Sequence, residues 1–240
     1  MRPRQTLLLG LLLLLPVLAF LFLFRFGSNR YALPTYLPDR VDSTQVGGEW
    51  QRDTVFHQIA PFQLSASTGR AVSSQELGQG LYIAQFFADD EASAKVARQL
   101  LRVQEKFRHE PRVKLVTFVL NKDAANTARL SKLAEQYGTI AGKWFFLAGP
   151  ADTLRHLTQN EFRLTADPKR LPGAVYTANI PAGRLLLVDN QRRVRGIYDG
   201  PDGREIDRLL TEVTVQLDDY EPPHESSAPP GAGARRLHAL

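Results

Sequence analysis

Hydrophobic residues in the middle of the chain form short runs that alternate with segments of helical spacing. Two nearly continuous apolar runs, Leu81–Phe87 and Val113–Val119, predict strands that are covered on both faces. Residues Trp144–Leu147 predict a further short strand. Two pairs of apolar segments separated by turn residues predict β-hairpins, one around Ser67–Gly69 and the other around Asp189–Asn190. The middle of the chain therefore supplies the strands of a sheet.

Apolar residues spaced three and four apart predict amphipathic helices after the first two runs and at the end of this region. Their positions are Val96, Leu100, Val103 and Phe107; Leu130, Leu133, Ala134 and Tyr137; and Ile206, Leu209, Leu210, Val213 and Leu217. Residues 151–160 predict another helical segment, and Asp202 with Glu205 predicts a cap for the last helix. This order predicts an α/β domain of three layers, with helices packed over a central mixed sheet.

The N-terminal region contains a long uncharged run, the 19 residues Thr6–Phe24. As a helix this run is about 28 Å long, close to the hydrocarbon core of a bilayer at about 30 Å. A cleaved signal peptide is the alternative, but its cleavage site needs small residues, and residues 20–26 are bulky. Residues 1–26 therefore predict an uncleaved, single-pass membrane anchor. The flanking arginines favour an extracytoplasmic location for the C-terminal domain.

Two other segments lack apolar periodicity. Residues 27–50 contain Pro34, Pro38 and the pair Gly47–Gly48, and predict a stalk. Residues 218–240 are rich in proline and poor in apolar residues, and predict a disordered tail. Residues 51–217 remain as the folded domain, and they are numerous enough to bury a core.

Composition excludes several chemistries. The chain has no cysteine, so it can form no disulfide, thiol nucleophile, thiolate metal site or iron–sulfur cluster. Lysine and arginine number 30 against 25 acidic residues, for a formal charge of +5. This excess is scattered and does not form the basic stripe typical of nucleic-acid binding. We therefore expect no nucleic-acid partner.

Four strings in the middle of the chain carry a resemblance: RVQEKF (102–107), VKLVTF (113–118), WFFLAG (144–149) and LLLVDNQRRVRGIYDG (185–200). In their order and spacing they resemble the Sco/SenC family. The resemblance covers essentially all of residues 51–217 and implies a thioredoxin-like fold. It also implies a membrane-anchored protein that delivers copper to respiratory oxidases or reduces their thiols.

The chemistry of that family resides in a C-x-x-x-C motif and a histidine, a ligand set that suits Cu(I). Counting from the matching strings places the two cysteine positions at Asp89 and Ser93, and the histidine position at Pro181. None of these residues offers copper a soft donor. We therefore expect no catalytic residue, no cofactor and no metal ligand at these positions, and no enzymatic activity.

Three groups of residues could carry other chemistry. Asp89, Asp90 and Glu91 could bind a hard cation or act as acid–base groups, but Asp89 or Asp90 as the cap of the following helix is favoured. His57 could be a ligand, although an ordinary surface histidine is favoured. The arginines of the late hairpin could face phosphate headgroups or an acidic partner, and a solvated strand face is favoured; they are Arg192, Arg193 and Arg195.

Three functional hypotheses follow. The first is a non-catalytic Sco-like protein that acts by protein binding in the assembly of a respiratory oxidase. The second is a metal-handling or redox-linked protein with a rebuilt site around Asp89, Asp90 and Glu91, and possible help from His57. The third is a generic membrane-tethered scaffold. Retention of the framework without its ligands favours the first over the second.

Overall fold

The structure is a computed structural model of the 240-residue chain, and it describes residues 14–18, 20–22, 33–46, 49–88, 90–120, 127–164 and 183–219. Residues 1–32 form one unit and residues 33–240 another. In the first unit the described residues are helical and exposed. Over the part of the chain that is described, no helix is long and apolar enough to cross a membrane. Most of the predicted anchor Thr6–Phe24 lies outside this part, so the anchor stays a prediction.

The second unit is built on a mixed sheet of seven described strands in the order β4-β3-β7-β6-β5-β8-β9. The central strands β5, β6 and β7 are parallel, and the strands on either side of them are antiparallel to their neighbours. The bounds are β3 (Gln63–Ala66), β4 (Ala71–Ser73), β5 (Leu81–Phe87), β6 (Val113–Val119), β7 (Trp144–Ala148), β8 (Arg184–Val188) and β9 (Val194–Asp199). The predicted runs and hairpins are therefore confirmed as strands.

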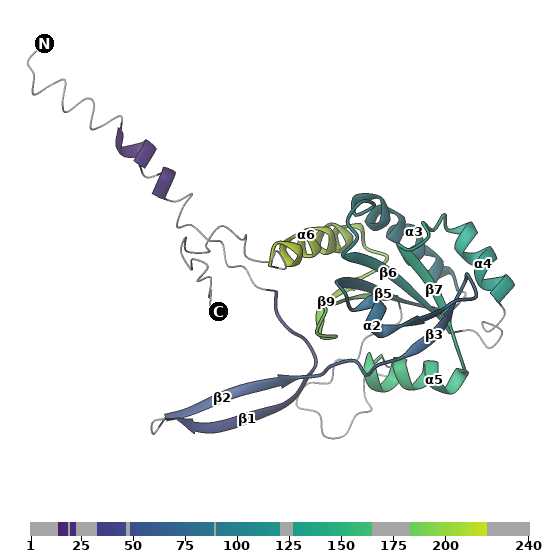
Figure 1. Cartoon of the computed structure of the whole chain (residues 1–240), viewed down its shortest axis with the longest axis horizontal. Coiled ribbons are helices and arrows are strands. Elements are labelled where there is room, and N and C mark those ends of the chain that lie inside the picture. The colour runs from purple at the N-terminus through teal and green to yellow at the C-terminus, as the bar shows by residue number, and fades with distance from the viewer. Residues whose placement is uncertain are drawn as a thin grey trace, which may run out of the picture. The chain divides into compact units, whose positions relative to one another are not determined.

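Helices cover both faces of this sheet (Figure 1). On one face lie α3 (Glu91–Lys106), α4 (Thr127–Gln136) and α6 (Gly203–Asp219). On the other lie α2 (Ser74–Leu77), α5 (Ala151–His156) and the π-helical segment η1 (Leu157–Glu161). These elements confirm the predicted helices and the three-layer α/β architecture. The last helix runs two residues beyond the predicted domain end at Leu217, and its cap is Asp202, whose carboxylate accepts a hydrogen bond from Arg204 N.

Each face of the sheet has its own hydrophobic core. Along β5, Leu81, Ile83 and Phe87 enter the core under α3, α4 and α6, whereas Tyr82, Ala84 and Phe86 enter the other. Because successive side chains of a strand point to opposite faces, a strand covered on both sides is apolar at nearly every position, and Gln85 is the polar exception in β5. All seven residues of β5 are buried. The double burial accounts for the continuous apolar run in the sequence.

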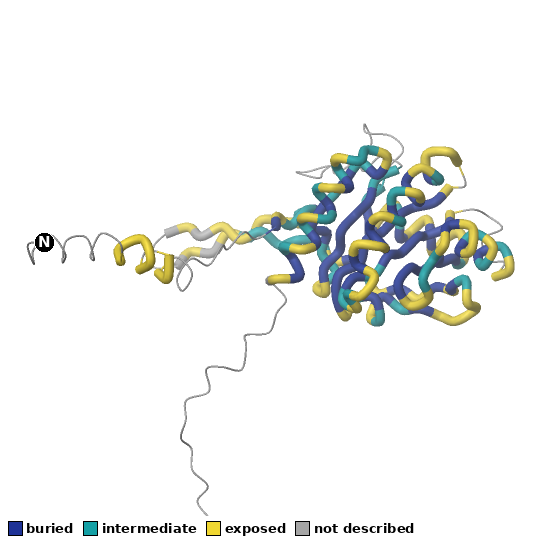
Figure 2. The backbone as a smooth tube through the Cα atoms, turned by 90° about the horizontal axis from the view of Figure 1, so that it is seen from above, coloured by how far each residue is buried: buried dark blue, intermediate teal, exposed yellow. Residues whose placement is uncertain are grey.

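The predicted stalk differs from the structure in its second half. Strands β1 (Pro38–Val46) and β2 (Glu49–Phe56) pair antiparallel and form a separate two-stranded sheet. This hairpin is largely exposed (Figure 2). None of the side chains of these strands whose burial the structure describes is buried, so the strands lack the alternation by which a sequence signals a strand. The second unit, which begins at Leu33, includes this hairpin, and the predicted bounds of the folded domain, 51–217, stay a prediction.

The segment just before the hairpin crosses the β9 edge of the large sheet. Tyr36 N donates to Val194 O of β9, a bond of 2.8 Å. On either side of this contact, Leu33 is buried in the core under α3 and α6, and Leu37 is buried in the core of the opposite face. Residues 33–37 therefore contribute one anchor residue to each core.

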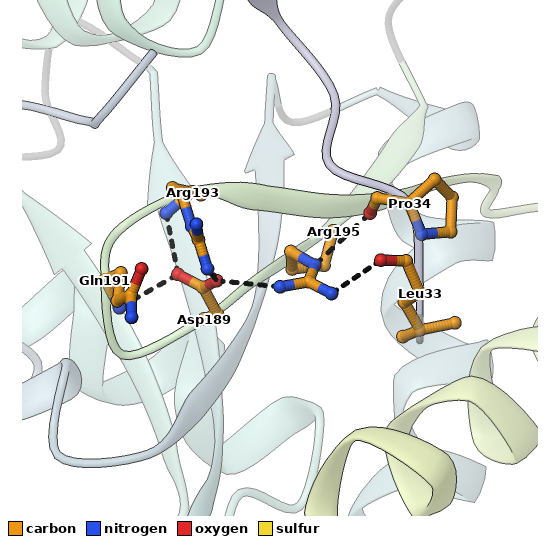
Figure 3. A network of polar contacts seen from close by, with 6 residues as sticks. All are labelled: Leu33, Pro34, Asp189, Gln191, Arg193 and Arg195. Carbon is orange, nitrogen blue, oxygen red and sulfur yellow. Dashed lines mark hydrogen bonds and ion pairs between the residues drawn. The ribbon is translucent and has the colours of Figure 1, made fainter. Parts of the chain in front are cut away.

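An internal ion-pair network holds this segment in place (Figure 3). Asp189, which is 1% exposed, accepts hydrogen bonds from Gln191 N and Arg193 N at 2.9 Å, and it pairs with Arg193 and Arg195. Arg195 also donates to Leu33 O at 2.5 Å and to Pro34 O at 3.2 Å. The favoured interpretation of a solvated arginine face is therefore wrong for Arg195, which is buried because its guanidinium binds groups of the protein itself.

We predict that Asp189→Asn lowers the free energy of unfolding by about 3 kcal/mol, since it leaves the guanidinium of Arg195 buried without its counter-charge. Urea unfolding of a fragment of residues 33–219 measures this change. Asp202→Asn is the matched control, because asparagine caps a helix about as well as aspartate and the change should stay within about 0.5 kcal/mol. Equal loss in both variants would contradict a special role for Asp189.

Candidate functional site

The candidate site lies at the carboxyl end of β5, where the chain turns into α3. The described residues of this turn are Ala88 and Asp90; Asp89 lies outside the described part, as does Pro181. The alignment of these two positions with family ligands therefore stays a prediction. Ser93, the third predicted position, lies in the first turn of α3 and is buried.

Ser93 links β5 to α3 through hydrogen bonds of its hydroxyl, its backbone N–H and its carbonyl. Its hydroxyl oxygen accepts from Ala88 N at 3.1 Å, and its backbone N–H donates to Asp90 Oδ1 at 2.7 Å. Its carbonyl accepts from Gln85 Nε2 at 2.8 Å. A hydroxyl at this position is therefore a structural group that closes the turn between strand and helix.

A buried polar chain continues from Ser93 across the three parallel strands. Gln85 of β5 accepts through Oε1 from the Thr117 hydroxyl of β6 at 3.1 Å. The same hydroxyl accepts from Trp144 Nε1 of β7 at 2.9 Å. Gln85 and Thr117 are fully buried and Trp144 is nearly so, and an unpaired polar group at such a place costs about 1–3 kcal/mol. The chain Ser93–Gln85–Thr117–Trp144 is satisfied within the protein.

The two described acidic residues of the turn, Asp90 and Glu91, make their contacts within α3. Asp90 is the N-cap of α3, and the hydrogen bonds from Ser93 hold the pKa of its carboxyl below the ordinary value. Glu91 is exposed and pairs with Lys95 at 3.1 Å, one turn along the helix. Among the described residues, no group of three histidines, aspartates or glutamates is arranged to hold a metal ion. The prediction of a helix cap is thus confirmed for Asp90.

His57 lies between two carboxylates rather than on the open surface. Its Nδ1 is 3.4 Å from Asp39 Oδ2, and its Nε2 is 3.4 Å from Glu161 Oε2. The His57 side chain is 16% exposed, and Glu161 Oε2 also accepts from Ala60 N at 2.6 Å. The favoured interpretation of an ordinary surface residue is therefore wrong. His57 thus lies between the root of the β1–β2 hairpin and η1, and among the described residues its Nε2 has no hydrogen-bond partner.

Sequence reasoning missed Asp39, Glu161 and Arg163 as partners in this cluster. Arg163 pairs with Asp39 and has a backbone φ of 51°. Asp39 and Arg163 are 124 residues apart, and no local pattern links them. The cluster consists of side chains that bind one another, so its evident role is to hold the hairpin root against the domain.

Comparison with known proteins supports the fold. No protein-family model matches the sequence, and no curated protein matches it. Solved structures do match: a SCO1/SenC family lipoprotein from Bacillus anthracis is 14% identical, with a TM-score of 0.56 over 67% of this chain and 95% of that one. BsSco, a member of the Sco family of cytochrome c oxidase assembly proteins, is 17% identical, with a TM-score of 0.52 over 67% and 94%.

The ScoI protein of Arabidopsis thaliana, solved with copper bound, is 14% identical, with a TM-score of 0.51 over 68% of this chain and 99% of that one. These likenesses show that the chain has a thioredoxin-like α/β fold similar to that of Sco/SenC proteins over most of its length. The chain itself has no cysteine, so it lacks the thiols of thiol–disulfide chemistry.

We predict that Thr117→Val lowers the free energy of unfolding by roughly 2 kcal/mol, because it leaves Gln85 Oε1 and Trp144 Nε1 buried without their partner. Thr214→Val is the matched control: the Thr214 hydroxyl is exposed and bonds only to Leu210 O of its own helix among the contacts described. Urea unfolding of both variants gives the comparison. A loss no greater for Thr117 than for Thr214 would show that the buried chain adds nothing to stability.

Proposed function

We propose that this protein is a membrane-anchored, Sco-like factor that acts by binding another protein, without copper transfer or thiol chemistry of its own. The observation that carries the proposal is Ser93. At the position predicted for a family cysteine, its hydroxyl and backbone are engaged in closing the turn between β5 and α3. The thioredoxin-like framework is present, and Ser93 stabilises the turn between β5 and α3.

The proposed partner is a component of a respiratory oxidase. Support comes from BsSco, which belongs to a family of cytochrome c oxidase assembly proteins. Its fold resembles that of this chain. An assembly factor must recognise its partner through a surface, and a thioredoxin-like domain can do so without a reactive site. The apolar run Thr6–Phe24 supports tethering at the membrane where such partners reside.

Two alternatives lead to different observations. A rebuilt metal site around Asp89, Asp90 and Glu91 has less support, because Asp90 caps a helix and Glu91 pairs with Lys95. A generic scaffold would show the same lack of copper binding but no enrichment of oxidase components. Affinity purification from solubilised membranes distinguishes the two binding roles. Recovery of oxidase components supports the proposed role, and their absence contradicts it.

We predict that the protein binds Cu(I) no more tightly than a protein surface does, because Asp89, Ser93 and Pro181 supply neither thiolate nor imidazole. Competition against a Cu(I) chelator measures this. The triple variant Asp89→Cys, Ser93→Cys and Pro181→His should gain measurable affinity, since two thiolates and one imidazole suit the ion. Stoichiometric binding by the unaltered protein would contradict the proposed function. A folded triple variant without affinity would show that these positions do not converge.

We predict that the full chain resists extraction from membranes by alkaline carbonate and keeps its N-terminal residues. An uncharged run of 19 residues is long enough to span the hydrocarbon core, and its bulky end disfavours cleavage. Fractionation and N-terminal sequencing measure both properties. Release into the soluble fraction, or a mature N-terminus near residue 27, would contradict the anchor.

A further inference from the structure

The hairpin of β1 and β2 has two chemically different faces. The register pairs Val41 with Thr54, Ser43 with Arg52 and Gln45 with Trp50, and cross-strand partners share a face. Val41 is 52% exposed and Trp50 is 69% exposed. An indole ring and an isopropyl group thus stand on one side of the hairpin, with Arg52 between them. We call this side, defined by these six residues, the Trp50 face.

Acidic residues lie on the opposite side. Asp42 and Asp53 are directly paired across the strands, and Arg40, which is on the same side, binds Asp42 at 2.9 Å. Like charges in direct opposition weaken a strand pair, so the Asp42–Asp53 pair does not stabilise the hairpin. The two carboxylates and the cation Arg52 are therefore segregated to opposite sides of one thin sheet.

The root of the hairpin is fixed to the domain. His57 N donates to Leu37 O at 2.8 Å, closing the base of the two strands. Asp39 of β1 pairs with Arg163, and His57 lies between Asp39 and Glu161. A two-stranded sheet on its own is marginally stable in water. The contacts at the root hold this hairpin as an arm, and a surface that covers the Trp50 face would stabilise the rest.

The occupant that fits this face best is an anionic lipid surface. Tryptophan prefers the interface between headgroups and acyl chains, and arginine binds phosphate groups. The carboxylates of Asp42 and Asp53, which an anionic surface would repel, lie on the other side. Only 13 residues separate Phe24 from Pro38, so the linking segment spans at most about 48 Å when fully extended. The proposed anchor would keep the hairpin within that distance of the bilayer.

We propose that the Trp50 face binds the headgroup region of the membrane, so that the hairpin becomes a second contact that orients the domain on the bilayer. The inference rests on the proposed membrane anchor. In this contact the indole of Trp50 and the side chain of Val41 enter the membrane interface, and Arg52 pairs with lipid phosphate. Because the root is fixed, this contact would set the direction in which the domain faces.

The chain offers its own probe for this contact. It has two tryptophans, and Trp144 is buried in the core whereas Trp50 is exposed. We would reconstitute the full chain in vesicles of phosphatidylcholine with and without phosphatidylglycerol, and quench its fluorescence with brominated phosphatidylcholine. We expect most of the Trp50 emission to be quenched, more completely with phosphatidylglycerol present. The remaining emission, from Trp144, should equal that of the variant Trp50→Phe.

Matched variants test the role of charge. Arg52→Ser should lose the response to phosphatidylglycerol, whereas Arg40→Ser, which removes the same charge from the opposite side, should keep it. A chain that is bound to vesicles but shows no quenching of Trp50 contradicts this inference and leaves the anchor intact. A chain that does not bind vesicles contradicts both. Protection of Trp50 that depends on protein concentration and not on bromolipid would assign the face to a second copy or a protein partner instead.

Discussion

Arg195 is held by a buried ion pair with Asp189, and from there it joins parts of the protein that are far apart in sequence. Asp189 is held by the backbone of its own turn, so it presents a fixed carboxylate to Arg195. Arg195 in turn donates to the carbonyls of Leu33 and Pro34. A guanidinium satisfies several acceptors in one plane, and here it fastens the entering chain to the edge of the sheet. The same entering segment places Leu33 in one core and Leu37 in the other.

The same interaction shows what the sequence could and could not predict. The strands Leu81–Phe87 and Val113–Val119 were predictable to the residue, because burial on both faces favours a nearly continuous apolar run. The place of Arg195 was not predictable, because its acceptor on Leu33 lies 162 residues away. Alternation along a hairpin indicates which arginines share a face, but it does not indicate whether a carboxylate lies beneath them. The polar strands β1 and β2 escaped detection for a related reason: their side chains follow no buried surface.

At the candidate site, the rules for helix capping predicted the role of a residue that the family resemblance alone did not. An acidic residue directly before a helix is a common cap, and Asp90 caps α3 as expected. The buried chain from Ser93 through Gln85 and Thr117 to Trp144 was not predictable, since it joins one residue from each of three strands to a helix. Its members look like ordinary polar exceptions in apolar runs. Only the parallel register of β5, β6 and β7 brings them together.

The framework and the chemistry of this fold are physically separable. Ser93 closes the turn before α3 through hydrogen bonds that need an oxygen acceptor and backbone groups, not a metal. The two cores and the Arg195 network are built from side chains other than Ser93. A chain without the thiols can therefore keep the same architecture, and the proposed binding role would use its surface. The feature that most distinguishes that surface is the hairpin, which exposes Trp50 while its root is held by Asp39, His57 and Arg163. Removing the apolar surface of an exposed indole from water is favourable, so the contact that we propose for this face would be stabilised by the burial of Trp50.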